Sequence, residues 1–169
     1  TTGYKGGNSF FTAPGNYDSS AGGGGAFGAA SNATGKGGYN GGIGFVSAID
    51  GTSTGRGGGG GGGGFSNAPS IGTGPAGGGN GGENGDNVSE RATAGAANTG
   101  GGGGGGAGSG SPDSTREGGA GGSGVVIIRY PSAQAAVLSG GATGDIDQAI
   151  SGSTDKYAKV TGSGTITFS

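Results

Sequence analysis

The chain has 169 residues, of which 54 are glycine and only 28% are hydrophobic, and its formal net charge is −2. Cysteine and histidine are both absent, which excludes disulfides, thiolate chemistry and imidazole bases or metal ligands. The few lysines and arginines are scattered singly, so no basic stripe for nucleic acid is present.

The longest strongly apolar stretch covers residues 125–128 and is far shorter than the roughly 20 residues of a membrane-spanning helix. We therefore expect a protein that is not membrane-embedded. Because histidine and cysteine, two of the commonest catalytic side chains, are missing, we also expect no catalytic residues, no cofactor and no enzyme activity. Acidic pairs such as Glu83 with Asp86, or Asp145 with Asp147, resemble solvated loops more than a calcium site, since no EF-hand pattern surrounds them. We expect no bound metal.

Glycine is concentrated in dense segments separated by dissimilar polar stretches. Glycine has no side chain to bury and loses the most backbone freedom on folding, so backbone hydrogen bonds must supply the cohesion. Extended glycine chains can adopt the threefold polyproline-II conformation, whose amides and carbonyls all point outward toward neighbouring chains. The sequence therefore predicts a stacked polyglycine-II helix sandwich over residues 1–124. The dense segments lie near residues 3–7, 22–28, 35–44, 55–64, 72–82, 100–108 and 118–124.

Residues 125–169 have a different composition and are predicted to form a small β segment. The β-branched residues of 125–130 predict a strand that ends at Pro131. Two alternating stretches joined by a glycine-containing turn predict a β-hairpin over residues 157–168. The only helical candidate is a turn over residues 145–150, which Asp145 would cap.

The connections between glycine runs are the expected recognition surface, because loops concentrate function. If successive runs alternate in direction, loops 8–21, 45–54 and 83–99 share one end, and loops 29–34, 65–71 and 109–117 share the other. The first set is longer and carries more aromatic and charged side chains, so we predict that it binds the receptor. The predicted receptor-binding residues are Phe10, Phe11, Tyr17, Phe45, Glu83, Asp86, Glu90 and Arg91.

Glycine runs that alternate with dissimilar polar loops resemble the receptor-recognising adhesins of T-even-type bacteriophage long tail fibres. Residues 118–131, GGAGGSGVVIIRYP, are similar to the closing signature of glycine-rich modules in phage tail and virion proteins. Residues 156–168, KYAKVTGSGTITF, are similar to the hairpin that usually begins such modules, although here they follow the glycine-rich part. The resemblance implies a polyglycine-II sandwich whose loops bind a bacterial surface receptor.

From these features we expect a host-receptor-binding component of a phage tail fibre, located on the extracellular virion. Its partners would be an outer-membrane protein or glycan of the host and an upstream tail-fibre or other virion protein. The assembly would be a homotrimer, as tail fibres commonly are, or a single-chain tip carried on a trimer. One alternative is a structural virion or extracellular-filament protein. Another is an ice-binding protein, although the regular G-x-x repeats of that class are absent.

Overall fold

The computed structural model describes residues 3–10, 19–64, 70–83, 91–108 and 117–169. The chain divides into two compact units, one formed by Thr1–Phe45 and Gly55–Ser123 and the other by Val46–Thr54 and Gly124–Ser169. The predicted domains were residues 1–124 and 125–169. The structure differs from this division in that Val46–Thr54 belongs to the second unit. No helix occurs in the described ranges, and the regular elements there are extended runs and short strands.

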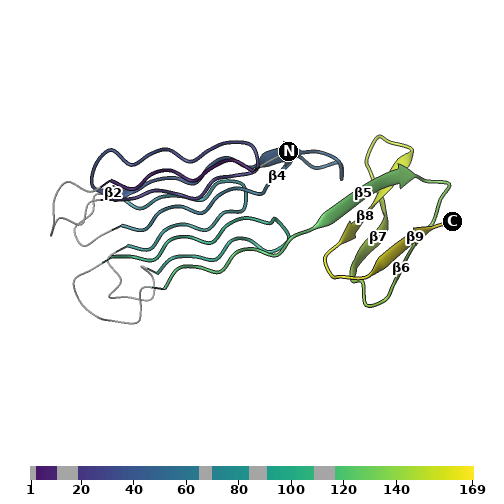
Figure 1. The fold of residues 1–169 in the computed structure, drawn as a ribbon. Coiled ribbons are helices and arrows are strands. Elements are labelled where there is room, and N and C mark those ends of the chain that lie inside the picture. The colour runs from purple at the N-terminus through teal and green to yellow at the C-terminus, as the bar shows by residue number, and fades with distance from the viewer. Residues whose placement is uncertain (1–2, 11–18, 65–69, 84–90, 109–116) are drawn as a thin grey trace. The chain divides into compact units, whose positions relative to one another are not determined.

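The first unit consists of extended runs that lie side by side along their length (Figure 1). Consecutive runs alternate in direction, as the antiparallel hydrogen bonds from Tyr4 to Gly25 and from Gly7 to Gly22 show for the first pair. Most of this backbone is extended without belonging to a β-ladder. The runs cover residues 3–10, 19–26, 28–34, 37–44, 57–64, 70–75, 78–83, 91–97, 100–108 and 117–123.

Residues 57–64, the central run, form the interior of this unit. Every glycine from position 58 to 64 is buried. The central run exchanges backbone hydrogen bonds with five other runs, namely 19–26, 37–44, 70–75, 78–83 and 100–108. A β-strand bonds to two neighbours only, whereas the threefold polyglycine-II conformation directs its amides to several sides. The predicted non-helical, glycine-rich polyglycine-II sandwich is therefore confirmed.

Close approach of the backbones explains why the central run contains only glycine. A Cβ atom on Gly59 would lie 2.6 Å from the carbonyl carbon of Gly23 and closer still to its oxygen. A Cβ on Gly61 would overlap the carbonyl of Gly72 in the same way. These neighbours are backbone atoms, which cannot rotate aside as a side chain would. Any larger residue would push the runs apart and break the hydrogen bonds between them.

Outer runs carry side chains on the faces that point to solvent. In the run of residues 37–44, Asn40 and Ile43 are exposed, whereas Gly41 and Gly44 are buried. This spacing of three residues is the period of the polyglycine-II helix. Side chains are therefore tolerated along one edge of a run while glycine faces the lattice.

Polar side chains cap many of the outward-facing amides of this unit. Asn40 Oδ1 accepts hydrogen bonds from Thr73 N at 2.8 Å and from Thr73 Oγ1 at 3.0 Å. Asn80 Oδ1 accepts from Gly74 N at 3.0 Å. Thr93 Oγ1 in turn accepts from Asn80 N at 2.8 Å. The asparagine and threonine side chains thus replace the neighbouring chain that an edge run lacks.

Four short strands precede the sheets of the C-terminal part of the chain. Strand β1 (Ser19–Ser20) pairs in parallel with β2 (Gly37–Gly38). Strands β3 (Phe45–Ser47) and β4 (Thr54–Arg56) form a second two-stranded sheet.

The second unit contains two small antiparallel sheets (Figure 1). Strands β5 (Val126–Pro131), β8 (Asp155–Val160) and β7 (Gly144–Ala149) form a three-stranded sheet in the order β5-β8-β7. Strands β6 (Ala136–Ser139) and β9 (Thr165–Phe168) form the other sheet.

The core of the second unit is a small cluster between these strands. Ala158 is completely buried, and Tyr130 and Ala136 are 5% and 3% exposed. The ring of Tyr130 packs edge-on against Phe168 at a centroid distance of 4.8 Å. Partly buried isoleucines pack against this cluster; they are Ile128, Ile146 and Ile166. The β-branched strand expected at residues 125–130 is therefore present as β5, shifted by one residue.

Two expectations for this unit are wrong. Residues 157–168 do not form a hairpin, because β8 pairs with β5 and β7 while β9 pairs with β6. Local alternation predicted both strands correctly but carries no information on their partners. Residues 145–150 form most of strand β7 instead of a helical turn. A register shift between Asp145 and Gln148 accommodates Asp147 at φ 55°, in the left-handed region.

Candidate recognition surface

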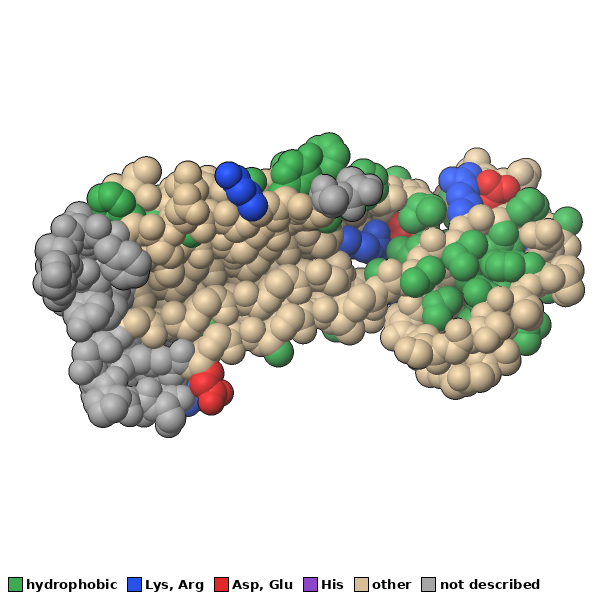
Figure 2. Space-filling view, viewed as in Figure 1, with side chains coloured by type: hydrophobic (Ala, Val, Ile, Leu, Met, Phe, Trp, Pro, Cys, Tyr) green, Lys and Arg blue, Asp and Glu red, His purple; other side chains and the backbone are tan. Residues whose placement is uncertain are grey.

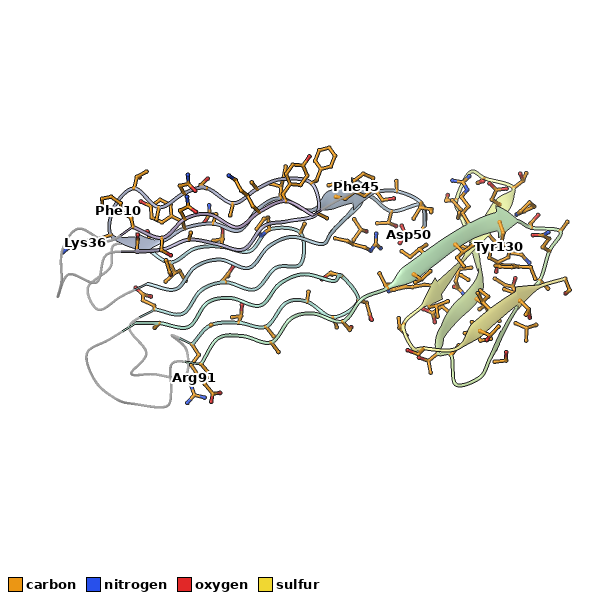
Figure 3. All side chains as sticks on the ribbon, viewed as in Figure 1. Phe10, Lys36, Phe45, Asp50, Arg91 and Tyr130 are labelled. Carbon is orange, nitrogen blue, oxygen red and sulfur yellow. The ribbon has the colours of Figure 1, made fainter. Side chains whose placement is uncertain are left out.

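Four internal segments lie outside the described residues, namely 11–18, 65–69, 84–90 and 109–116. The residues that flank these segments lie at one end of the first unit, which we call the gap end. Phe10 and Ser19 form a β-bridge there, with Phe10 N donating to Ser19 Oγ at 3.1 Å. Gly64 N donates to Gly82 O, and Gly108 N donates to Gly64 O. Gly38 N donates to Ser70 O. Figure 3 shows Phe10, Lys36 and Arg91 at this same end of the unit.

The opposite end of the first unit, which we call the turn end, is closed mainly by tight connections. Gly78 N donates to Pro75 O across a turn in which Ala76 has φ 48°. Asn98 has φ 60°, and its backbone N–H donates to Ser123 Oγ at 2.9 Å. Phe27 N and Gly28 N both donate to Ile43 O. Phe45 also lies at this end, at the start of β3 (Figure 3).

The predicted grouping of the loops is therefore wrong. Loop 45–54 begins at the turn end, whereas the described ends of loop 8–21 and the start of loop 83–99 belong to the gap end. The chain also contains runs that the glycine count did not reveal, since residues 28–34 and 91–97 are lattice runs rather than loops. Most of their alanines and threonines are exposed or half-buried, with Ala33 the buried exception, so few glycines are needed there. Because consecutive runs alternate in direction, each additional run reverses the direction of all later runs and moves the later loops to the opposite end.

The predicted receptor-binding residues are consequently divided. Phe10, Glu83 and Arg91 lie at the gap end, and all three are exposed. Phe45 is 53% exposed and lies at the turn end. Phe11, Tyr17, Asp86 and Glu90 lie outside the described residues.

An exposed apolar patch at the turn end was not predicted as a group. It consists of Phe27, Ile43 and Phe45, which are 58%, 56% and 53% exposed. The rings of Phe27 and Phe45 are 6.1 Å apart. With about 100 Å² exposed per side chain, the patch approaches the size of functional surface patches. Figure 2 shows apolar side chains grouped on an otherwise largely tan face of the first unit. In the sequence, Ile43 lies 16 positions after Phe27 and 2 positions before Phe45. The turn at Phe27 brings its ring next to the other two side chains.

A polar cluster in the second unit joins the three strands of the sheet β5-β8-β7. Tyr130 Oη donates to Asp147 Oδ1 at 3.0 Å and accepts from Asp147 N at 2.9 Å. Lys156 Nζ lies 2.8 Å from Asp147 Oδ1. The hydrogen bond from Lys156 lowers the pKa of the Asp147 carboxyl, and burial raises the pKa of the Tyr130 hydroxyl. The contacts hold the left-handed Asp147 in place, so the cluster has a structural explanation.

The second unit also has an open groove of about 550 Å³. It is lined by Gly124 to Val126 at the start of β5, by Val160 to Gly164, and by the start of β9. Its side chains are apolar or hydroxyl-bearing, and none is ionisable. This groove therefore offers no acid, base or nucleophile beyond weakly acidic hydroxyls.

Two further kinds of feature are absent from the described ranges. No group of three or more histidine, cysteine, aspartate or glutamate side chains there is arranged to hold a metal ion. No helix among those residues is long and apolar enough to cross a membrane.

Comparison with known proteins gives one match. Residues 1–131 match the family model described as "Glycine-rich domain". The matched region therefore covers the lattice runs and continues through strand β5. No curated protein and no solved structure matches the chain.

Proposed function

The chain belongs to the glycine-rich domain family, and from its lattice geometry we propose that it is a non-enzymatic recognition protein. Its role would be to bind a host receptor as the adhesin or tip component of a bacteriophage tail fibre. The protein would then be extracellular, on the virion. Its receptor would be an outer-membrane protein or a glycan of the bacterial surface.

The observation that carries this proposal is the presence of exposed aromatic and charged side chains on several runs at the gap end. Loops that converge on one end of a rigid scaffold are a common way to build a binding surface. Phe10, Glu83 and Arg91 come from three separate runs and are exposed at this end. An aromatic ring and charges of both signs at one end of a unit suit a protein or carbohydrate partner. Lys36, at the turn between two runs, adds a further exposed charge there.

A lattice scaffold also explains how the sequence of such a surface can vary. The hydrogen bonds that hold the runs together are made by backbone atoms and do not depend on the loops. Loop residues can therefore change without altering the core, which is useful for a protein that recognises a variable receptor.

The apolar patch at the turn end favours a second candidate function. Phe27, Ile43 and Phe45 would suit packing against another virion protein, such as an upstream tail-fibre component. A structural virion or extracellular-filament protein would need this contact and no receptor surface. The two candidates therefore assign importance to opposite ends of the first unit.

Phe10→Ala and Phe27→Ala form a matched pair that tests the two functions. Both rings are exposed, at 39% and 58%, so neither substitution removes much buried area. Receptor binding predicts that Phe10→Ala particles assemble normally but adsorb poorly to host cells. A structural role predicts that Phe27→Ala particles fail to assemble.

The measurements are particle yield and the rate of adsorption to cells. Wild-type adsorption by Phe10→Ala, Glu83→Ala and Arg91→Ala particles alike would contradict the receptor surface proposed here. Purified protein should also compete with particles for adsorption, and a lack of competition would argue against receptor binding.

A further inference from the structure

The chain contains three asparagines that are followed directly by glycine, in the pairs Asn40–Gly41, Asn80–Gly81 and Asn84–Gly85. The third pair lies outside the described residues. In an unfolded chain such a pair loses ammonia spontaneously, because glycine has no side chain to shield its nitrogen from the neighbouring carboxamide. The first two pairs lie within lattice runs, where hydrogen bonds to the neighbouring runs act on both reacting groups.

The reaction requires the glycine nitrogen to reach the asparagine side chain. The nitrogen attacks Cγ and gives up its proton to water, and the side-chain nitrogen leaves as ammonia. Water then opens the cyclic succinimide at one of its two carbonyls. One product is aspartate. The other is isoaspartate, in which the main chain runs through the former side chain and is one atom longer.

Both reacting groups of Asn40–Gly41 are held by one residue of the neighbouring run, Thr73. Asn40 Oδ1 accepts hydrogen bonds from Thr73 N at 2.8 Å and from Thr73 Oγ1 at 3.0 Å. Gly41 N donates to Thr73 O at 2.9 Å. While these bonds exist, the proton that the reaction must remove is donated to a carbonyl, and the carboxamide cannot turn toward the nitrogen.

Asn80–Gly81 is held in the same way by the same run, residues 70–75. Asn80 Oδ1 accepts from Gly74 N at 3.0 Å, and Gly81 N donates to Gly72 O at 2.9 Å. Asn80 is exposed, as Asn40 is, so water reaches both side chains. Burial therefore does not protect the two pairs, and the hydrogen bonds of the lattice do.

The lattice also favours this reactive pair at both places. A Cβ on Gly41 would lie 2.5 Å from the carbonyl carbon of Gly59, and one on Gly81 would lie 2.5 Å from that of Gly62. Glycine is therefore required at both positions. The asparagine before each of them caps an amide of the next run. Close packing and capping together place asparagine before glycine.

Isoaspartate would not fit back into either run. The carbonyls on either side of Asn40, at Tyr39 and Gly42, accept from Gly62 N and Gly59 N of the central run, both at 2.9 Å. The two runs match because three residues separate the bonds on each of them. An extra main-chain atom between the two carbonyls breaks one bond or the other. The second pair is flanked by bonds to the central run in the same way.

We propose that Asn40 and Asn80 are deamidation sites that the closed lattice protects and that react irreversibly once their runs open. A run that opens briefly and closes again returns unchanged. A run that stays open long enough to form isoaspartate cannot return to its place. The two pairs thus limit the lifetime of the folded protein according to how often the runs open. This chemistry is independent of receptor binding.

The first test compares deamidation rates by mass spectrometry of protease digests. The folded full chain is incubated at mildly alkaline pH beside peptides of residues 37–43, GGYNGGI, and 77–83, GGGNGGE. Reaction at Asn40 and Asn80 should be at least about a hundredfold slower in the folded chain than in the peptides, because it must wait for the runs to open. In guanidinium chloride the full chain should react as fast as the peptides. Equal rates in the folded chain and the peptides would overturn the proposed protection.

The second test separates main-chain length from the change of charge. Every protein in it carries Asn84→Ser, which removes the third pair. Chains aged in guanidinium chloride at mildly alkaline pH and then refolded should lack the cooperative thermal transition of the first unit in proportion to their isoaspartate content. The same treatment at mildly acidic pH, where the reaction is slow, is the control and should leave refolding intact.

A freshly prepared double variant, Asn40→Asp with Asn80→Asp, has the mass and charge of the deamidated chain but a main chain of normal length. It should refold as the unaged protein does, because a carboxylate oxygen accepts the same hydrogen bonds. Failure of this variant to refold would assign the damage to charge and overturn the proposal. So would full refolding of aged chains that contain isoaspartate at both positions.

Discussion

Replacing Gly59 with alanine tests directly how closely the runs must approach. The added methyl would overlap the carbonyl of Gly23 and lie 2.9 Å from the oxygen of Gly24. To relieve the overlap, the run of residues 19–26 has to move away from the central run. The movement would break the hydrogen bonds from Gly23 N to Gly60 O, at 2.9 Å, and from Ala26 N to Gly57 O, at 2.8 Å.

The expected loss can be estimated from these contacts. Two buried hydrogen bonds contribute about 1 kcal/mol each, and overpacking of a close interior costs about 1–3 kcal/mol. Alanine also restricts the unfolded chain, which returns about 0.4–1 kcal/mol. The net destabilisation of Gly59→Ala is therefore about 3 kcal/mol. For a domain of this size that lowers Tm by roughly 10 °C.

Gly121→Ala is the control, because a Cβ at that position meets nothing closer than Gly101 O at 3.7 Å. It should stabilise the first unit by about 0.4–1 kcal/mol through the unfolded state alone. Differential scanning calorimetry of both variants measures the two Tm values. Equal Tm values for Gly59→Ala and the wild type would refute the close-packing argument. So would a loss for Gly121→Ala as large as that for Gly59→Ala.

Three further predictions concern side chains. Asn40→Ala removes the acceptor for Thr73 N and Oγ1, so it should destabilise the first unit by about 1 kcal/mol in calorimetry, whereas an unchanged Tm would show that water replaces the cap. Tyr130→Phe leaves Asp147 N without its acceptor and should lower the stability of the second unit by about 1–3 kcal/mol in urea unfolding, with no loss indicating that the hydroxyl is dispensable. The pKa of Asp147 is lowered in the folded state, chiefly by the hydrogen bond from Lys156. The ionised carboxylate therefore stabilises the fold fully above the ordinary aspartate pKa of about 4. This stabilisation is lost as the pH falls through the lower pKa of the folded state. Asp147→Asn, which tolerates the left-handed backbone, should flatten the dependence of Tm on pH below about 4, and an unchanged slope would contradict this assignment.

The sequence was sufficient to predict the type of lattice. Uninterrupted glycine at residues 57–64 has few other structural uses in an ordered chain, and this run forms the interior. The strand near residues 125–130 was also predictable, because β-branched residues followed by proline favour a strand that ends there.

The topology was not predictable from glycine content, and the reason is the threefold period. An outer run needs glycine only on the sides that face other runs, so residues 91–97 form a run with one glycine, Gly95. Counting glycine-dense segments therefore missed whole runs. Phe45 was consequently grouped with Phe10, although the two lie at opposite ends of the unit.

The prediction of strand pairing in the second unit was wrong for a different reason. The stretch around Gly162 and Gly164 has hairpin-like alternation, but β8 gains more contact by lying between β5 and β7. Ala158 on β8 is completely buried in that arrangement. Pairing over a long sequence separation depends on such burial, which local patterns do not contain.

Native-state hydrogen exchange of the central run tests the main claim most directly. The claim is that amides of the glycine runs, bonded to neighbouring runs, replace a hydrophobic core. It predicts slow exchange, close to the global unfolding limit, for Gly58, Gly59, Gly61, Gly62 and Gly64. Gly60 and Gly63, whose amides donate to no described residue, should exchange faster, which gives a pattern with a period of three. Uniformly fast exchange across residues 58–64 would contradict the account, because these amides would then not hold the fold together.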